Sequence, residues 1–158
     1  MEEEFPYVYT DDRCYLWFFE NHLPGYAWYV PKANGYINIG IGGNVAKLRA
    51  KGSTIKMHWC RLVKKLDKSG LTSGYSFKPN GYSYYLHQKT VEVRKDNVLI
   101  VSDAVGLAIL DLGEGIRTAI ESGLLAADAI MHDTDYSIAS IPKYSLFLLL
   151  SSRLRNII

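Results

Sequence analysis

Hydrophobic residues follow two different spacings along the chain, and strand-like runs come first. Three short runs rich in aromatic and aliphatic side chains are separated by turn residues and predict strands. They cover residues 14–19, 26–30 and 36–41. In the third run one face is purely aliphatic, formed by Ile37, Ile39 and Ile41. Asn34-Gly35 between the last two runs is a strong hairpin signal, so residues 14–41 are expected to form an antiparallel meander with one packed face.

A helical spacing follows over residues 53–68, where apolar side chains form one stripe opposite Lys and Arg. The stripe consists of Ile55, Trp59, Leu62, Val63 and Leu66. Ser53 or Thr54 can cap the start of this helix, and Gly70 can cap its end. We expect the helix to lie across the sheet, with His58 beside its polar stripe and solvated.

Turn residues at 79–81 and 95–97 flank two further predicted strands, 82–86 and 90–93. A short apolar run at 98–101 then leads through a polar elbow and a glycine-rich turn into a second long amphipathic helix. The predicted buried face of this helix consists of Ile116, Ala119, Ile120, Leu124, Ala127 and Ile130. After a polar break at 132–135, a last helix is predicted over residues 143–158.

The stretch 97–131 has the strongest candidate chemistry. Asp103 follows the apolar run directly, and a carboxylate at the end of a strand can accept hydrogen bonds from ligand hydroxyls. A helix that opens on Gly113-Glu114-Gly115 leaves backbone N–H groups and the positive end of its dipole exposed. Both features suit a polyhydroxylated, anionic cofactor. Structural roles are the alternative: Asp111 and Glu114 have the spacing of a capping box with Asp111 as N-cap, and Asp103 can cap the loop.

Composition and charge exclude several classes of protein. The net charge is +2 and no Lys/Arg cluster interleaves with aromatic residues, so nucleic-acid binding is not indicated. Cys14, Cys60 and the four histidines lack the spacing of metal ligands, so no metal is predicted. The acidic start is not a signal peptide, and the apolar run at 146–150 is too short to span a bilayer. We therefore expect a reduced, cytoplasmic protein.

Residues 37–46 imitate a dinucleotide-binding fingerprint without matching it. Val45 stands where the third glycine belongs, and the preceding run alternates instead of being continuously apolar. No G-x-G-x-x-G, H-E-x-x-H, G-x-S-x-G or P-loop motif is present. Residues 37–46 are therefore not interpreted as a nucleotide site, and the strand is expected over 36–41.

Two longer segments, in this order, resemble the geranylgeranyl reductase family of flavoproteins, which share the FAD fold of aromatic hydroxylases. Residues 24–43, PGYAWYVPKANGYINIGIGG, are similar to the substrate-domain pattern P-x-x-Y-x-W-x-F-P followed by a lysine and a glycine hairpin. The matching residues are Tyr26, Trp28, Pro31, Lys32 and Gly35. Residues 98–130 are similar to the late flavin motif LLVGDAAG, GEGI, AIESG. The matching residues are Asp103, Ala104, Gly106, Gly113, Glu114, Gly115, Ile116, Ala119, Ile120, Glu121, Ser122 and Gly123.

This resemblance implies FAD as cofactor and the reduction of isolated double bonds in an isoprenoid lipid. The implied cofactor-binding residues are Asp103, Ala104, Gly106, Gly113, Glu114, Gly115 and Ile116, with Asp103 at the ribityl chain. Tyr26, Trp28 and Pro31 are implied to line an apolar slot for a prenyl chain. Packing on the sheet is almost as good an interpretation of Tyr26 and Trp28. The resemblance names no catalytic side chain.

The sequence departs from the family pattern at several positions. In the substrate-domain pattern, Leu23 occupies the first proline position and Val30 replaces the phenylalanine. In the flavin motif, Ser102 replaces the glycine before Asp103 and residues 108–111 lack a proline, and no βαβ unit with a glycine loop is encoded here. FAD binding by this chain alone is therefore predicted to be weak or absent. A split flavoenzyme, with the dinucleotide half on a second chain, and a non-catalytic remnant that binds a lipid or a protein remain alternative interpretations.

The predicted fold class is α+β. Residues 1–96 are expected to form an antiparallel-sheet substrate domain covered by helix 53–68, and residues 97–131 the last strand, loop and helix of an α/β FAD-binding domain. Residues 132–158 are expected to be helical, and the apolar and basic segment 143–158 either contacts a membrane peripherally or docks on the core. Residues 98–101 and the helix after Gly115 should expose apolar surface, which favours self-association.

Overall fold

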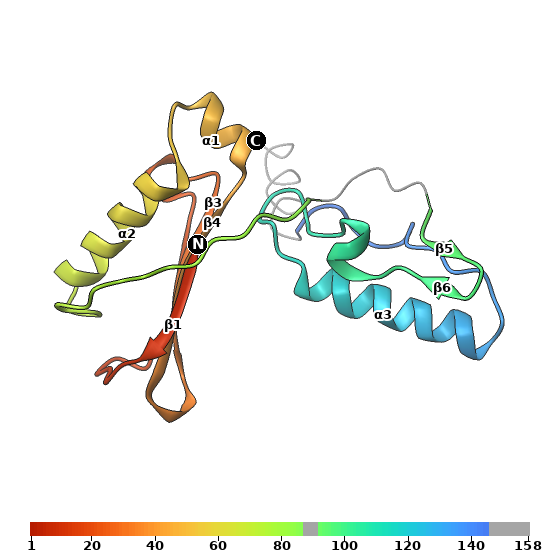
Figure 1. The fold of residues 1–158 in the computed structure, drawn as a ribbon, viewed down its shortest axis with the longest axis horizontal. Coiled ribbons are helices and arrows are strands. Elements are labelled where there is room, and N and C mark those ends of the chain that lie inside the picture. The colour runs from red at the N-terminus through yellow and green to blue at the C-terminus, as the bar shows by residue number, and fades with distance from the viewer. Residues whose placement is uncertain (87–91, 146–158) are drawn as a thin grey trace, which may run out of the picture. The chain divides into compact units, whose positions relative to one another are not determined.

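A computed structural model describes residues 1–86 and 92–145 (Figure 1). The chain divides into two compact units, Met1–Tyr82 and Ser83–Ile158, here called unit 1 and unit 2. The division falls earlier in the chain than the domain boundary expected between residues 96 and 97. The strand predicted at 90–93 and the helix predicted at 143–158 lie largely outside the described residues.

Unit 1 is built on a four-stranded antiparallel sheet in the order β1-β4-β3-β2 (Figure 1). The strands are β1 Glu2–Pro6, β2 Tyr15–Phe18, β3 Gly25–Lys32 and β4 Tyr36–Gly43. Asn34 and Gly35 join β3 to β4 at φ of 65° and 72°, as the hairpin signal predicted. β4 runs antiparallel to both of its neighbours, whereas a dinucleotide fingerprint needs a parallel strand. The strand predicted at 36–41 is confirmed within β4, and residues 45 and 46 begin a short helix.

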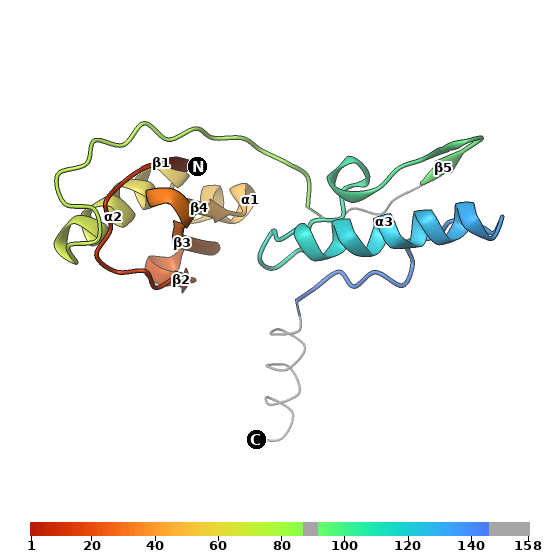
Figure 2. The ribbon, with the colours of Figure 1, turned by 90° about the horizontal axis from the view of Figure 1, so that it is seen from below.

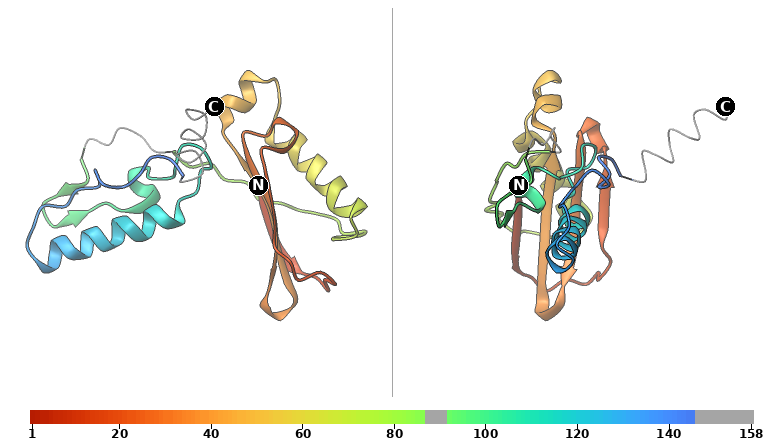
Figure 3. Two further views of the ribbon diagram at one scale, coloured as in Figure 1. Left: turned by 180° about the vertical axis from the view of Figure 1, so that it is seen from behind. Right: turned by 90° about the vertical axis from the view of Figure 1, so that its right-hand side faces the viewer.

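Helix α2, Ile55–Lys68, covers one face of this sheet (Figures 2 and 3). The Thr54 hydroxyl caps its start by accepting the Met57 N–H at 3.2 Å. At its end Gly70 adopts φ 72°, and the Leu71 N–H donates to the Leu66 carbonyl at 3.0 Å. This is a Schellman cap, so both predicted ends of the helix are confirmed.

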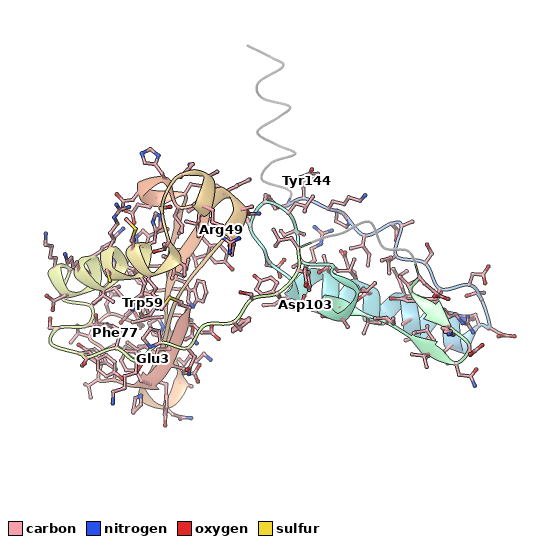
Figure 4. The ribbon with its side chains drawn as sticks, turned by 45° about the horizontal axis from the view of Figure 1, so that its top comes forward. Glu3, Arg49, Trp59, Phe77, Asp103 and Tyr144 are labelled. Atoms are coloured by element: carbon pink, nitrogen blue, oxygen red, sulfur yellow. The ribbon has the colours of Figure 1, made fainter. Side chains whose placement is uncertain are left out.

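The core of unit 1 lies between α2 and the sheet. Ile37, Ile39 and Ile41 are at most 2% exposed, as their alternation predicted. Figure 4 shows Trp59 and Phe77 on the side of the sheet that α2 covers, and their rings meet edge to face at 5.7 Å. His58 is only 4% exposed, so the expectation of a solvated His58 was wrong. The buried face of α2 is wider than the apolar stripe indicates, because the loop after β2 also covers it.

Two elements of unit 1 were not predicted. One is β1, whose three glutamates are poor strand formers. Its Glu4 carboxylate accepts hydrogen bonds from the Lys32 ammonium and, at 3.2 Å, from Asn38, while Glu3 accepts the Tyr75 hydroxyl at 2.9 Å. The other is the short helix α1, Val45–Ala50, which Asn44 caps.

The described residues of unit 2 form a small hairpin, a short 3₁₀ turn and one long helix. Strands β5 Arg94–Lys95 and β6 Val98–Leu99 pair across the predicted turn. The 3₁₀ turn η3, Ser102–Val105, follows, and α3 spans Ile116–Met131 alongside the hairpin (Figures 1 and 2). The strand expected over 82–86 does not form. Leu86 makes only an isolated bridge to Ala108, because no second strand lies beside this segment among the described residues.

Helix α3 turns its small residues inward and its large ones outward. The buried residues are Thr118, Ser122, Ala126 and Ala129. The exposed aliphatic residues, here called the outer face of α3, are Ile116, Ile120, Leu124, Ile130 and Met131, between 59% and 75% exposed. The predicted buried face was therefore wrong. Within unit 2 the helix approaches its hairpin closely through small side chains, and the expectation that this helix exposes apolar surface is confirmed.

Candidate functional site

Asp103 of η3 lies against the first turn of α3, as Figure 4 shows. A β-carbon built on Gly115, the N-cap of α3, would stand 2.8 Å from Asp103 Oδ1. The carboxylate therefore occupies the space that any larger residue at position 115 would fill. The structure thus brings together the elbow and the glycine turn, which the nine loop residues 104–112 separate in the sequence.

Ser122, on the buried side of α3, fixes the elbow that presents Asp103. Its hydroxyl accepts the Ser102 N–H at 3.0 Å and donates to the Ala119 carbonyl at 3.1 Å. Ser102 itself adopts φ 59°, a left-handed conformation that glycine adopts without strain. The glycine that the family pattern has here thus matches the backbone geometry of this turn.

The loop between the elbow and the helix folds back on itself. The Gly113 N–H donates to the Ile109 carbonyl and the Ile109 N–H to the Glu114 carbonyl, each at 2.9 Å. Gly113 adopts φ 70°, and its carbonyl accepts the Tyr84 hydroxyl. The apolar part of this loop is buried, with Ala108 fully so. The loop without a proline is therefore held by packing and hydrogen bonds.

The start of α3 presents backbone donors beside Asp103. Glu114 Oε1 accepts the Arg117 N–H at 3.0 Å, which satisfies one of the first helical amides. Among the described residues, no acceptor faces the N–H groups of Gly115 and Ile116. Asp111 does not cap this helix, because its carboxylate accepts the Ser145 N–H at 3.1 Å. The capping-box interpretation with Asp111 as N-cap is therefore wrong.

This arrangement fits the flavin end of FAD. The carboxylate can accept from hydroxyls, the two amides can donate to an electron-rich edge, and Gly115 lets the carboxylate lie close to the backbone at the start of α3. The remaining predicted contacts belong to the same place: Ala104 lies exposed in η3, and Gly106 ends that turn at φ 68°. The binding roles of these residues stay predictions.

An aromatic platform lies on the face of the sheet opposite α2. Phe18, Tyr26 and Trp28 form a row with ring centroids 5.5 and 5.4 Å apart. The Trp28 ring lies over Gly40, where a β-carbon would stand 1.9 Å from it, and its Nε1 donates to Asn38 at 2.6 Å.

Pro31 lies on the other face of the sheet by strand alternation, since it pairs with the buried Ile37. The structure therefore groups two of the three predicted substrate-binding residues, Tyr26 and Trp28. Their role in binding a substrate stays a prediction.

The described residues were also considered as a metal site and as a membrane span. Over residues 1–86 and 92–145, no group of three or more His, Cys, Asp or Glu side chains is placed to hold a metal ion. In the same ranges, none of the helices has the length and apolar character needed to cross a bilayer.

The chain is similar to individual known proteins. No family model matches the chain. It is 30% identical over 135 residues to digeranylgeranylglycerophospholipid reductase 3 of Methanosphaera stadtmanae, covering 83% of this chain and 33% of that protein. Reductase 2 of the same organism is 32% identical over 85% of this chain and 34% of its own length. This chain is a homologue of the geranylgeranyl reductases.

A solved structure supports the same relationship. A geranylgeranyl bacteriochlorophyll reductase-like protein from Thermoplasma acidophilum is 26% identical to this chain with a TM-score of 0.51. The similarity covers 83% of this chain and 33% of that structure. The chain thus spans about a third of the length of the relatives it matches. Its mixed helices and antiparallel sheet agree with the predicted α+β class.

Proposed function

We propose that these 158 residues form the substrate sheet and the flavin end of an FAD-dependent oxidoreductase of the geranylgeranyl reductase type. Its reaction would be the reduction of carbon–carbon double bonds in an isoprenoid lipid. The observation that supports this most directly is the Asp103 carboxylate against Gly115, beside the donors at the start of α3. The homology to named digeranylgeranylglycerophospholipid reductases supports the class of substrate.

Asp103 would hold the ribityl hydroxyls, and the Gly115 and Ile116 amides would face the pyrimidine edge of the ring. The positive end of the α3 dipole stabilises negative charge there by about 0.3–2 kcal/mol. FAD, when bound, would supply the reducing electrons. The chain's own contribution is orientation: Ser122 sets the elbow, and Tyr84 and Ile109 set the glycine turn.

The aromatic platform would contact the prenyl chain. Phe18 is 47% exposed and the neighbouring Leu16 is 50% exposed, so this face presents apolar area to a lipid. Gly40 is needed for the platform, because only a residue without a β-carbon lets the Trp28 ring lie flat on β4. One side of the proposed prenyl-binding slot would therefore be a flat row of aromatic rings.

The outer face of α3 would dock the polypeptide that binds the rest of FAD. This face exposes large aliphatic side chains on a helix whose other side is packed with small residues. A surface of that kind marks a protein interface. Since the chain spans about a third of its relatives, we propose that residues outside these 158 supply the dinucleotide-binding half, on the same or on a second chain. Without that half, self-association would cover the face.

The test is to prepare this chain together with the dinucleotide-binding half of a homologue and incubate it with reduced FAD and a geranylgeranyl lipid. Mass spectrometry should show a gain of two hydrogens for each reduced bond. Trp28→Ala should lower turnover of the lipid, and Val8→Ala, which changes a fully exposed apolar residue elsewhere, should not. A colourless assembly that leaves the lipid unchanged would refute the proposal.

A non-catalytic binding module is the second candidate, and one observation favours it. The aromatic platform lies wholly within unit 1, so prenyl-lipid binding needs no flavin. On this alternative the chain binds a prenyl lipid, Trp28→Ala weakens that binding, and no bond is reduced in the assembly. The absence of any lipid binding would remove it.

A further inference from the structure

Unit 1 contains a small cavity at the edge of its core that the proposed function does not use. It measures about 40 Å³ and lies between α2, the end of β2 and the short turn η1, Glu20–His22. That is room for little more than one water-sized group. Polar and charged side chains line part of it: Glu20, Asn21, His58, Arg61 and Lys65.

His58 is the unusual member of this lining. It is 96% buried, and its Nε2 is inaccessible to solvent and has no hydrogen-bond partner. Burial of an unpaired ring nitrogen is costly, and a side chain such as leucine would fill the site without that cost. A polar side chain in this position is consistent with a partner that enters the cavity.

The charges around His58 indicate which kind of partner fits. Lys65 is already paired, since it donates to both carboxylate oxygens of Glu20 at 2.6 and 2.8 Å and lies 4.4 Å from the Trp17 ring centroid. Arg61 also lines the cavity, and no ion pair of its guanidinium occurs among the described residues. The unbalanced charge at the cavity is therefore positive.

The wall formed by η1 is strained. Phe19, Asn21 and His22 all adopt left-handed conformations, at φ of 56°, 51° and 64°. Non-glycine residues adopt such conformations where the surrounding structure forces them, and they cluster at ligand sites. Of these three residues, Asn21 lines the cavity.

We propose that this cavity binds one oxygen of a phosphate group, with Arg61 as its donor and the buried His58 ring in the wall beside it. The phosphate is either inorganic phosphate or the phosphate of a polar lipid headgroup. The inference concerns unit 1 alone and does not depend on flavin binding. The pKa of His58 is lowered by burial and then by the cations Arg61 and Lys51, so its ring is neutral at pH 7. A bound anion opposes these effects and raises that pKa.

Imidazole NMR of the full chain tests this with inorganic sulfate as probe, because sulfate keeps its charge throughout the range. Sulfate should shift the His58 ring signals and raise its pKa, and should bind more tightly as the pH falls from 7 to 5. The exposed His132 is the internal reference. Arg61→Gln should weaken binding at least about tenfold. Lys64→Gln, on the same helix but outside the cavity, should change it less than about twofold.

The source of the phosphate is distinguished by comparing inorganic phosphate with glycerol 1-phosphate. Tighter binding of glycerol phosphate, lost equally in Arg61→Gln, indicates a lipid headgroup, and equal binding indicates the free anion. The proposal is overturned if none of these anions moves the His58 signals. It is also overturned if Lys64→Gln weakens binding as much as Arg61→Gln, because the effect is then non-specific surface charge.

Discussion

Ser122 and Ser102 are joined by a hydrogen bond that connects α3 to the elbow carrying Asp103. The Ser122 hydroxyl, fully buried on the inner face of the helix, accepts the Ser102 N–H at 3.0 Å. The position of the Asp103 carboxylate over Gly115 therefore depends on a side chain about two helical turns along α3 from Gly115. Ser122 has no surface through which it could contact a ligand.

We predict that Ser122→Ala destabilises the protein by about 1–3 kcal/mol, because it leaves the part-buried Ser102 N–H without a partner. Urea unfolding measures this free energy. Ser137→Ala is the matched control, since its hydroxyl accepts only the exposed Ala139 N–H, and it should change the free energy by less than about 0.5 kcal/mol. If both variants changed the free energy of unfolding equally, the Ser122 hydrogen bond would contribute no more to stability than an exposed one.

Ser102, the partner of Ser122 in this hydrogen bond, has a left-handed conformation, and a substitution there is predicted to stabilise the protein. Ser102→Gly should raise the free energy of unfolding by about 1 kcal/mol, because glycine adopts φ 59° without strain. Ser102→Ala keeps the β-carbon and should give no such gain. Thermal unfolding of the two variants checks this, and a destabilised glycine variant would mean that the serine side chain has a role of its own.

Gly115→Ala should separate structure from ligand binding. The new β-carbon meets only the tip of the Asp103 side chain, which can rotate away, so the cost in stability should be about 1 kcal/mol or less. The displaced carboxylate should nevertheless weaken flavin binding in the assembled protein by at least about tenfold. Gly123→Ala, in the same helix with nothing within 4 Å, is the control and should stabilise α3 by about 0.5–1 kcal/mol. Unchanged flavin affinity in Gly115→Ala would place the flavin elsewhere.

The outer face of α3 should control association. Replacing Ile120 and Leu124 together by glutamate puts charge where both side chains are more than half exposed, so the fold should persist. In sedimentation experiments the unchanged chain should associate through this face, and the double variant should be monomeric at the same concentration. Val8→Glu adds charge to an exposed site in unit 1 and should leave association unchanged. A chain that is monomeric at every concentration would contradict self-association through α3.

Local signals allowed much of unit 1 to be predicted. The β3–β4 hairpin follows from Asn34-Gly35, and α2 follows from its stripe and caps. β1 escaped prediction because its pairing depends on partners distant in sequence, such as Lys32 for Glu4. His58 was misplaced for a related reason: burial by a loop has no periodic signature in the helix that it covers.

The site in unit 2 was predictable only in part. The motif names Asp103 and Gly115, and the structure brings them together. Periodicity also identified the aliphatic stripe of α3, but the sequence pattern does not show whether this stripe packs within unit 2 or stays exposed. Within this unit the helix packs through Ser122 and Ala126 instead, and Ile120 remains exposed. The helix orientation was therefore decided by tertiary packing that the pattern does not contain.

The measurement that tests the central claim most directly is an equilibrium titration with FAD of this chain alone and of this chain with a dinucleotide-binding half. On the proposed function, Asp103 and the start of α3 would form only one end of the flavin site, so we predict weak or undetectable binding alone and tight binding, with flavin absorbance, in the assembly. Affinity below about 1 μM for the 158 residues alone would contradict the account, since the site would then be complete. Absence of flavin from both samples would contradict it as well.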